Sequence, residues 1–286
     1  MFTKWVKKVV LVCAVSLLGT LAIGCGGSGT PASTSGGSAA TPSTATSASS
    51  DMLKTIQDRG YLIAGVKHDV PAMGQLRPGG LEPEGFEIDL MKALAKKIFG
   101  DENKIKLEKV ESKTRISMLQ NGQVDIVAGT TTITEERKQQ VDFSDVYFLA
   151  GQSLLAQKGG SVQSVNDLKG KVVATVQGST SAMNIRQMAP DAQVLEFPTY
   201  TEAFLALKQG RTDAMTTDNS ILMGFAANEP DYELMGGPFS QEPYGLAFQK
   251  GHPEWVKYCN DFLKEMKDSG KYAELYKKWF KAEPPK

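Results

Sequence analysis

Residues 129–145, with the sequence GTTTITEERKQQVDFSD, combine groups that bind a carboxylate. Three consecutive threonines supply hydroxyl groups. Thr134 then stands at a helix N-cap position, with two glutamates in the predicted first turn and Arg137 directly behind them. A helix start offers free N–H groups and positive potential, and a guanidinium forms two parallel hydrogen bonds with a carboxylate. The stretch therefore predicts a carboxylate site, although an ordinary capped helix with a solvated arginine explains it equally well.

The elements that must position this stretch are short apolar runs alternating with amphipathic segments. In the segment 86–99, Leu90, Leu94 and Ile98 share one helical face, and the lysines lie off it. Predicted strands cover residues 62–66, 105–107, 125–128, 172–176, 194–197 and 214–217. Predicted helices cover residues 86–99, 113–121, 181–188, 201–209, 255–266 and 272–280. This alternation favours an α/β fold with mostly parallel strands.

A short internal repeat indicates two related halves. Residues 119–125 and 207–213 share the spacing of a leucine, a glycine three positions on and an aspartate three further. Glycine is common where helices end, so chance is an alternative explanation. Polar residues follow each copy at the end of a predicted strand, Thr130 to Thr132 in the first half and Asp218 in the second. Ligands of open α/β sheets bind at these strand ends, and two facing lobes would form a cleft.

The N-terminus predicts export and a lipid anchor. Three lysines precede the uncharged, mostly apolar segment 9–22, which is shorter than the roughly 20 residues that span a bilayer. The sequence LAIGC ending at Cys25 resembles a bacterial lipobox, which implies cleavage after residue 24 and lipidation of Cys25. The alternative is a plain signal peptide with an idle thiol. Residues 25–50 are almost wholly Gly, Ser, Thr, Ala and Pro, so we expect a flexible tether.

Composition excludes several classes of site. Only Cys259 remains after the predicted N-terminal segments, so the folded part is expected to have no disulfide and no cysteine metal cluster. The 32 basic residues equal the 32 acidic ones, and no basic stripe indicates nucleic-acid binding. No second apolar segment is long enough to span a membrane. We expect no metal and no cofactor.

Three longer segments resemble a known family. They are GFEIDLMKALAKKI, VESKTRISMLQNGQVDIVAGTTTITEERKQQVDFSDVYF and TTDNSILMGF. Together they resemble the family 3 solute-binding proteins of polar amino-acid ABC importers, over Met52 to about Phe280. The resemblance implies two Rossmann-like lobes joined by a two-crossing hinge, the type II periplasmic-binding-protein architecture. It places the crossings near residues 147–151 and 241–245, with lobe 1 at 51–148 plus 246–286 and lobe 2 at 149–245.

The resemblance also implies a clamp for an α-amino acid. A zwitterion needs a cation for its carboxylate and an anion for its ammonium. By resemblance Arg137 forks onto the α-carboxylate, assisted by Thr132. The carbonyl of Thr130 and the carboxylate of Asp218 meet the ammonium. A second-lobe helix start supplies further N–H groups for the carboxylate, from the segment that contains Gln177, Ser179 and Thr180.

A second set of residues is expected to face the ligand side chain. Lys67, Arg115 and Tyr200 resemble the trio of the glutamate- and aspartate-binding branch. A second carboxylate buried without a countercharge would cost several kcal/mol, which two extra cations would offset. We therefore expect an acidic ligand, with glutamine or a broader set of polar amino acids as the alternative. In another interpretation, Lys67 or Arg115 pairs with a nearby acid such as Asp69 or Glu111 and points outward.

The resulting expectation is a monomeric, lipid-anchored receptor outside the cytoplasmic membrane. It would close around the amino acid by hinge bending and present it to an ABC permease, without catalysing a reaction. Secreted dehydratases for prephenate-like dicarboxylates share this fold, and they would need a carboxylic acid such as Glu82 or Glu84 near the substrate. A sensory input module is a third class, which the lack of a following membrane segment disfavours.

Overall fold

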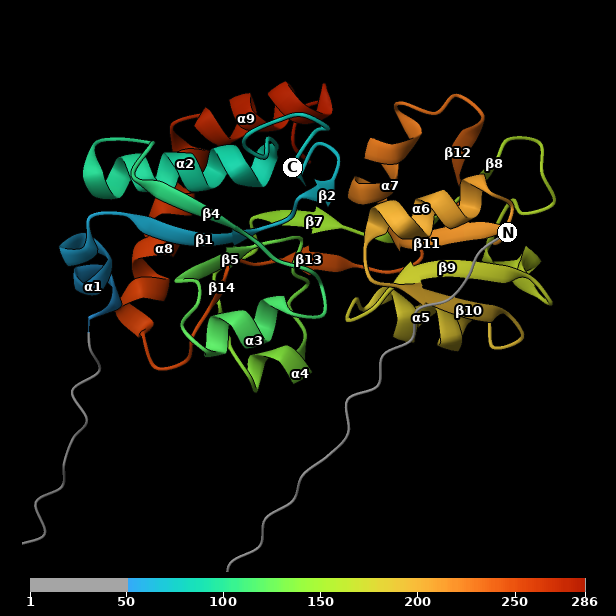
Figure 1. Cartoon of the computed structure of the whole chain (residues 1–286), viewed down its shortest axis with the longest axis horizontal. Helices are drawn as coiled ribbons and strands as arrows, with labels where there is room; N and C mark the ends of the chain where they lie inside the picture. Colours follow the sequence, from blue (N-terminus) through green and yellow to red (C-terminus); the bar gives the residue numbers. More distant parts are fainter. Residues whose placement is uncertain (1–50, 286) are drawn as a thin grey trace, which may run out of the picture. The chain divides into compact units, whose positions relative to one another are not determined.

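The computed structural model describes residues 51–285, so the predicted signal peptide, Cys25 and the tether lie outside the described residues. Strands of the described part form two five-stranded sheets and two two-stranded ones, with helices on the faces of the large sheets (Figure 1). The predicted α/β class is correct. Within residues 51–285, no helix has the length and apolar character needed to cross a bilayer.

The first large sheet carries the N-terminal half of the candidate site. Its spatial order is β4 (Ile105–Lys109), β1 (Leu62–Val66), β5 (Ile126–Ala128), β14 (Ala247–Phe248) and β6 (Asp142–Phe143). In Figure 1, α2 and α9 lie above this sheet and α3 and α4 below it. The helices of this lobe are α1 (Met52–Arg59), α2 (Phe86–Phe99), α3 (Arg115–Gln120), α4 (Glu135–Lys138), α8 (Pro253–Asp268) and α9 (Lys271–Phe280). A small hairpin of β2 (Asp69–Val70) and β3 (Gly74–Gln75) follows β1.

The second large sheet repeats this arrangement. Its order is β10 (Gln193–Phe197), β9 (Val172–Val176), β11 (Ala214–Asp218), β8 (Gln152–Gln157) and β12 (Tyr232–Met235). Its helices are the 3₁₀ helix η1 (Val165–Leu168), α5 (Ser181–Met188), α6 (Tyr200–Lys208) and α7 (Asn219–Ala226). Figure 1 shows α6 and α7 on one side of this sheet and α5 on the other. We call the parts around the two sheets lobe 1 and lobe 2.

The expectation of mostly parallel strands is wrong in detail. Parallel pairing is confined to β4, β1 and β5 in lobe 1 and to β10, β9 and β11 in lobe 2. Strands β14 and β8 pair antiparallel with β5 and β11. Both of these strands enter their sheets directly from the crossings between the lobes. Because no helix intervenes to bring the chain back in the same direction, the parallel order ends there.

Two short antiparallel strands make the crossings. β7 (Phe148–Ala150) pairs with β13 (Glu242–Tyr244), with Tyr244 opposite Phe148. The lobe boundaries expected at residues 148 and 245 fall within or beside these strands. The ring of Phe148 stacks on Tyr244 at 5.6 Å and meets Phe86 of α2 edge-on at 5.9 Å. The crossing strands are therefore anchored in the aromatic core of lobe 1.

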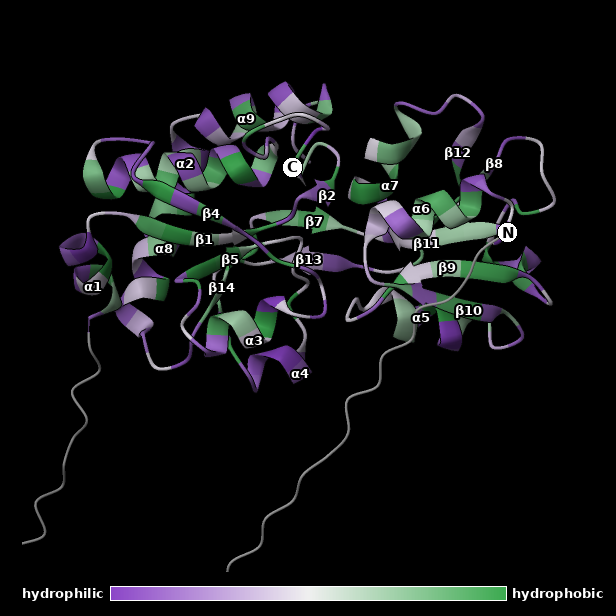
Figure 2. Ribbon diagram, in the orientation of Figure 1, coloured by the Kyte–Doolittle hydropathy of each residue, from purple (hydrophilic) through white to green (hydrophobic). Residues whose placement is uncertain are grey.

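Hydropathy follows the layers. Strands β1 and β5 are mostly apolar, whereas α1 and α4 are mostly polar (Figure 2). The apolar residues of β5 are buried, as are Leu62, Ala64 and Val66 of β1 and Phe86, Leu90 and Leu94 of α2. Burial of this apolar surface is the main favourable contribution to folding. It also fixes the strand ends from which the candidate site residues project.

Candidate functional site

The structure buries most of the charged residues predicted for the site. Lys67, Arg115 and Asp218 are at most 4% exposed, and Tyr200 is 2% exposed. Charged groups are rarely buried without partners, because leaving water costs several kcal/mol per ion. These side chains also influence one another, since Arg115 and Asp218 both affect the pKa of Tyr200. Residues from both lobes are thus gathered in one small buried volume.

Lys67 follows the last residue of β1 and points inward. Its Nζ donates to Oγ of Ser112 at 3.0 Å and lies 3.9 Å from Oδ1 of Asp69. The same nitrogen sits 5.0 Å from the ring centroid of Tyr200, so the expected neighbourhood of these two residues is present. Burial lowers the pKa of Lys67 to about 8, and the nearby Asp69 opposes this shift. The outward orientation considered as an alternative is wrong, but its pairing with Asp69 is present.

Arg115 is the first residue of α3, and it holds the turn that follows β5. Its Nη1 donates to the carbonyl oxygens of Gly129 and Thr130, at 2.6 and 3.1 Å. Thr130 has a φ of +50°, in the left-handed region that residues with a Cβ rarely adopt. The Nε of Arg115 is buried and has no hydrogen-bond partner within the described residues. Nη1 of this guanidinium therefore stabilises the turn, while its Nε remains unpaired within the described residues.

Arg137 lies behind the cap that the sequence predicts. The hydroxyl oxygen of Thr134 accepts a hydrogen bond from the Arg137 N–H at 3.2 Å. The helix α4 is a single turn, however, so the predicted contribution of a helix dipole to anion binding is small. The carboxylate site predicted for this region would therefore depend on the guanidinium itself. Its Nη1 donates to the Thr132 carbonyl at 2.8 Å, and burial lowers the pKa of Arg137 to about 10.

Asp218 is the last residue of β11 in lobe 2. Its Oδ2 accepts a hydrogen bond from the hydroxyl of Tyr244, which belongs to the crossing strand β13. Its Oδ1 is buried and has no partner among the described residues. Burial raises the pKa of Asp218 from an ordinary 3.8 to about 7, and the neighbouring Glu242 adds to the shift. A cationic donor placed at Oδ1 would relieve this cost.

The second-lobe segment at residues 177–180 precedes α5, as predicted, but its side chains are occupied elsewhere. Gln177 accepts from Lys113 of lobe 1 at 3.4 Å, and Ser179 donates to the Val176 carbonyl at 2.6 Å. Thr180 donates to Glu242 at 2.8 Å. Thr180 thus contacts the buried Glu242, which acts on Asp218, whereas these hydrogen bonds of Gln177 and Ser179 lie outside the buried charges. The ligand contacts expected of these three residues stay a prediction.

Direct contacts join the two lobes around the site. The backbone N–H of Tyr200 donates to Oδ2 of Asp69 at 2.8 Å, and the hydroxyls of Tyr200 and Ser112 lie 3.4 Å apart. Nη2 of Arg137 donates to the Gly178 carbonyl at 3.0 Å. These contacts close the lobes over the buried charges.

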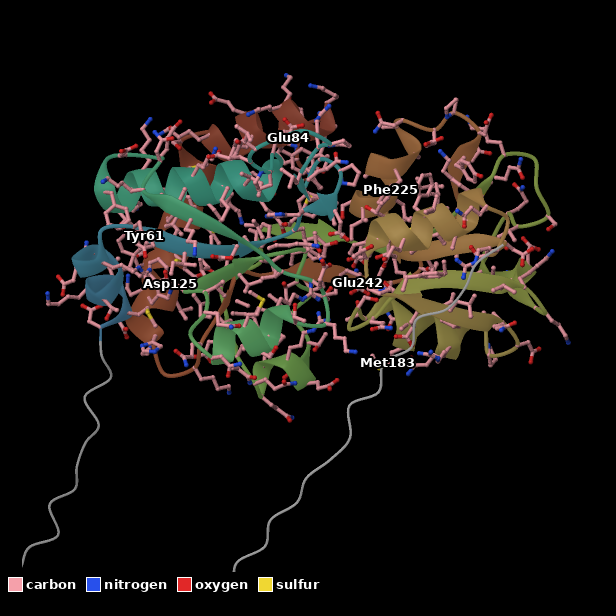
Figure 3. The ribbon with its side chains drawn as sticks, in the orientation of Figure 1. Tyr61, Glu84, Asp125, Met183, Phe225 and Glu242 are labelled. Atoms are coloured by element: carbon pink, nitrogen blue, oxygen red, sulfur yellow. The ribbon has the colours of Figure 1, made fainter. Side chains whose placement is uncertain are left out.

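The sequence prediction missed several residues of this network. Glu87 is fully buried in the first turn of α2, and Tyr147 and Tyr244 flank the crossings. Glu242, marked in Figure 3, accepts from Ser240 and Asn184 as well as Thr180. A glutamate at the start of an otherwise apolar helix face was the signal available for Glu87. The tyrosines carried no signal, because aromatic residues near crossings are usually core.

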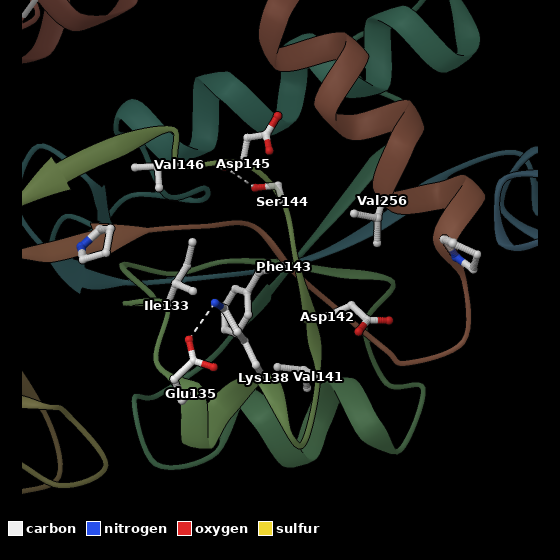
Figure 4. Close-up of a pocket in the computed structure, with 12 residues that line it drawn as sticks. Ile133, Glu135, Lys138, Val141, Asp142, Phe143, Ser144, Asp145, Val146 and Val256 are labelled. Carbon is white, nitrogen blue, oxygen red and sulfur yellow. Dashed lines mark hydrogen bonds and ion pairs between the residues drawn. The ribbon is translucent and has the colours of Figure 1, made fainter.

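A separate surface pocket lies outside this network. It has a volume of about 890 Å³ and is lined by residues of α4, β6 and α8. An ion pair of 2.8 Å between Lys138 and Glu135 stands at its edge (Figure 4). None of the predicted site residues lines this pocket. Within residues 51–285, no group of three or more His, Cys, Asp or Glu side chains is arranged to hold a metal ion.

Opposite buried charges supplied by two lobes with two crossings define a hinged ligand-binding protein. The chain belongs to the bacterial extracellular solute-binding proteins, family 3, whose model matches residues 62–282. The predicted family and the type II architecture are therefore correct. The protein is accordingly a solute-binding protein of an extracellular class.

Similar proteins fall into groups with different named ligands. The chain is 54% identical to the ABC transporter glutamine-binding protein GlnH of Bacillus subtilis, covering 82% of this chain and 86% of that protein. It is 56% identical to the glutamine-binding protein of Geobacillus stearothermophilus, covering 76% and 82%. The glutamate/aspartate import solute-binding protein of Salmonella typhimurium is 35% identical, with coverage of 69% and 68%.

Solved structures share the fold. An ancestral arginine-binding protein bound to glutamine has a TM-score of 0.73 and 42% identity, covering 78% of this chain and 99% of that one. The ancestral amino acid-binding protein AncCDT-1, a precursor of cyclohexadienyl dehydratase, has a TM-score of 0.74 and 38% identity, covering 80% and 99%.

Proposed function

We propose that the protein binds L-glutamine outside the cytoplasmic membrane and delivers it to an ABC permease. Two relatives above 50% identity are named for glutamine, and a relative named for glutamate and aspartate is at 35%. These identities favour glutamine, the alternative in the sequence analysis, over the acidic ligand that the sequence analysis expected. The geometry gives an independent physical argument for a neutral ligand side chain.

The first part of the argument is the α-amino-acid clamp. In this proposal Arg137 of lobe 1 binds the α-carboxylate, and Asp218 of lobe 2 binds the ammonium. The unpartnered, buried Oδ1 of Asp218 supports this role, because a carboxylate oxygen left without a donor is costly. Thr130 and Thr132 lie in the segment between β5 and α4, just before Arg137, and are at most 4% exposed. Each end of the zwitterion then meets an opposite charge from a different lobe, so binding favours closure.

The second part concerns the charges left over. Once the clamp is assigned, Lys67 and Arg115 remain as buried cations. Asp69 and Glu87 are buried beside them, and both of these acids raise the pKa of Lys67. With Asp69 and Glu87 ionised, the formal charges of the four residues balance, and Glu111 also acts on Lys67. Because burial raises the pKa of Glu87 to about 7, about half of its charge remains at neutral pH. Most of the positive charge is therefore matched before a ligand carboxylate arrives, whereas the amide of glutamine needs no countercharge.

The structural observation that carries this proposal is the position of Nζ of Lys67, 3.9 Å from Oδ1 of Asp69, an oxygen that has no hydrogen-bond partner within the described residues. The sequence analysis expects an acidic ligand because it treats Lys67 as a cation without a countercharge. With Asp69 beside it, Lys67 acts as a hydrogen-bond donor whose charge is already compensated. An amide oxygen needs such a donor, and the carboxylate oxygens or carbonyls nearby can accept from the amide NH₂ group.

A dehydratase activity gains little support from the structure. The acids named for it, Glu82 and Glu84, lie at the surface in ion pairs with Lys92 and Arg77. Neither of them joins the buried charges. We therefore do not propose catalysis, although AncCDT-1, whose structure is similar, is a precursor of cyclohexadienyl dehydratase.

The cellular setting follows from the family and from the N-terminus. We propose that Cys25 carries lipid and that residues 25–50 tether the folded part to the membrane, as the sequence predicts. We further propose that the protein acts as a monomer whose closed lobes dock on the permease. Globomycin-type inhibition of lipoprotein processing should then leave an unprocessed precursor, whereas a plain signal peptide would still be removed.

A thermal-shift screen of residues 51–286 with all proteinogenic amino acids tests the ligand. A ligand that binds only the folded state raises its stability by an amount that grows with concentration over Kd. L-Glutamine should give the largest shift. A larger shift with arginine, cysteine or glutamate would overturn the proposal.

A further inference from the structure

Glu87 is a fully buried carboxylate that the amino-acid clamp does not use. It lies in the first turn of α2, where the helix dipole favours negative charge. Its Oε1 accepts from the Thr130 N–H at 2.6 Å and from the hydroxyl of Tyr147. Its Oε2 is buried without a partner in the described part of the chain. Burying a carboxylate with one unpaired oxygen costs free energy, which the hydrogen bonds to its other oxygen must offset.

What Glu87 touches is the strained peptide of the site. Thr130 has a φ of +50°, a conformation that a Cβ makes unfavourable. Glu87 holds the N–H of this residue, and Arg115 holds its carbonyl and that of Gly129. The left-handed turn is therefore fixed from both sides by charged partners. Charge-assisted hydrogen bonds of this kind are roughly twice as strong as neutral ones.

We propose that Glu87 is a positioning residue for the amino-acid site. By holding the Thr130 N–H, it presents the Thr130 carbonyl and the Arg115 guanidinium in their binding geometry before the ligand arrives. The inference rests on the proposed function in one respect, namely that the turn at residues 129–132 contacts the bound amino acid. It assigns Glu87 no contact with the ligand.

Tyr147 connects this residue to the crossing strands. Its hydroxyl donates to Glu87, and its backbone N–H donates to the Tyr244 carbonyl at 3.0 Å. Tyr244 in turn donates its hydroxyl to Asp218. The two tyrosine rings lie 6.4 Å apart. Neighbouring residues at the two crossings thus support one acid from each lobe.

The charges that face Glu87 are consistent with this role. Burial raises the pKa of Glu87 to about 7, while Tyr147, Thr130, Lys67 and Arg115 oppose the shift. The carboxylate therefore stays close to its protonation midpoint at neutral pH. Its negative form strengthens the bond to the Thr130 N–H.

The test compares Glu87→Gln, Glu87→Leu and the control Asp89→Asn. Gln keeps an acceptor oxygen without the charge, and Leu removes the acceptor at similar size. Asp89 shares the first turn of α2 but bonds to Lys278 and Trp279 on α9. All three are titrated with L-glutamine by calorimetry at a temperature where circular dichroism shows the variant folded. The amide proton of Thr130 is followed by NMR in the ligand-free proteins.

We expect Glu87→Gln to weaken glutamine binding roughly tenfold and Glu87→Leu by roughly 100-fold or more. Asp89→Asn should bind within about twofold of the native protein. The Thr130 amide proton should move upfield in both Glu87 variants and stay in place in Asp89→Asn. Partial rescue by Gln relative to Leu separates positioning from a general loss of stability.

Folded Glu87→Leu that binds as tightly as the native protein would overturn the inference, and so would an unmoved Thr130 resonance. This outcome leaves the proposed function intact, because the native protein still binds glutamine. Conversely, a native protein that prefers another amino acid contradicts the proposed function. In that case the same variants are titrated with that amino acid, and the Thr130 resonance tests Glu87 without any ligand.

Discussion

Asp69 of lobe 1 accepts a hydrogen bond of 2.8 Å from the backbone N–H of Tyr200 in lobe 2. Tyr200 is the first residue of α6, so the carboxylate also meets the positive end of that helix. The other oxygen of Asp69 lies 3.9 Å from Nζ of Lys67. One acid therefore joins the two lobes and lies beside the cation that the proposal places at the ligand side chain. This double contact leads to the first prediction.

Replacing Asp69 with Asn should shift selectivity from glutamine toward glutamate. Asn keeps an acceptor for the Tyr200 N–H but leaves the charge of Lys67 uncompensated. We expect the ratio of glutamate to glutamine affinity to rise roughly tenfold, because the uncompensated charge of Lys67 would then be stabilised by the ligand carboxylate. Calorimetry with both ligands measures the ratio. Glu108→Gln serves as the control, because Glu108 pairs with Lys106, and it should leave the ratio within about twofold.

Asp218→Asn should nearly abolish amino-acid binding while leaving the fold intact. The ligand ammonium would lose its only charged acceptor in the proposed clamp, at a cost of about 3 kcal/mol or more than 100-fold in Kd. Asp213 offers a matched control just before the same strand, where it accepts from the Val172 N–H at 2.8 Å. Asp213→Asn should reduce stability slightly and leave Kd unchanged. Equal binding by Asp218→Asn and the native protein would remove Asp218 from the clamp.

Glutamine binding should release protons below neutral pH. The pKa of Asp218 is raised to about 7 by burial, and the ammonium requires the ionised carboxylate. Below pH 7 the affinity should therefore fall by up to about tenfold per pH unit, and near pH 6 binding should release close to one proton. Calorimetry in buffers of different ionisation enthalpy measures this release. It should persist in Glu87→Gln, which assigns it to Asp218, and it should vanish by pH 8.5.

The ligand-free protein should show the opposite trend in stability. Its folded Asp218 keeps a proton up to about pH 7, whereas the unfolded chain loses it near the ordinary pKa of 3.8. The native state therefore binds more protons in this window, and the contribution of Asp218 to the free energy of unfolding falls as the pH rises through it. Denaturant titrations of the native protein and Asp218→Asn should converge at low pH. Parallel pH profiles would contradict the raised pKa.

Gly224→Ala should weaken binding without any contact with the ligand. Gly224 lies in α7 of lobe 2, and a Cβ there would come 2.7 Å from the carbonyl oxygen of Pro71 in lobe 1. Because both atoms belong to the meeting surfaces, the added methyl opposes closure. We expect a loss of roughly tenfold in affinity and a smaller ligand-induced decrease in the radius of gyration by X-ray scattering. Met223→Ala, at an exposed position of the same helix, should change neither.

The architecture was largely predictable because each element has a local signal. The apolar stripe of α2 and the glycine after it define one helix, and the short apolar run of β5 defines one strand. Antiparallel insertion of β8 and β14 was not predictable from such patterns. Their direction is set by the crossings, which are tertiary features without a local sequence signature.

The candidate site was predictable in its charges but not in their balance. The resemblance predicts Lys67 and Arg115 as cations that face Tyr200, with outward orientation as the alternative, and the structure buries both. The sequence could not reveal that Arg115 donates from Nη1 to two backbone carbonyls. It also could not decide between a free Lys67 and the pairing with Asp69 that was its alternative. Both facts depend on the path of turns between strands and helices. They are also the facts that favour a neutral ligand over an acidic one.

The most direct test is calorimetric titration of residues 51–286 with L-glutamine and with L-glutamate at pH 7.5. The balanced buried charges predict that glutamine binds at least about 100-fold more tightly, which corresponds to about 2.7 kcal/mol. Removing the compensation in Asp69→Asn should narrow this gap. Glutamate binding as tightly as glutamine, or more tightly, would contradict the central claim and restore Lys67 and Arg115 as partners of a second ligand carboxylate.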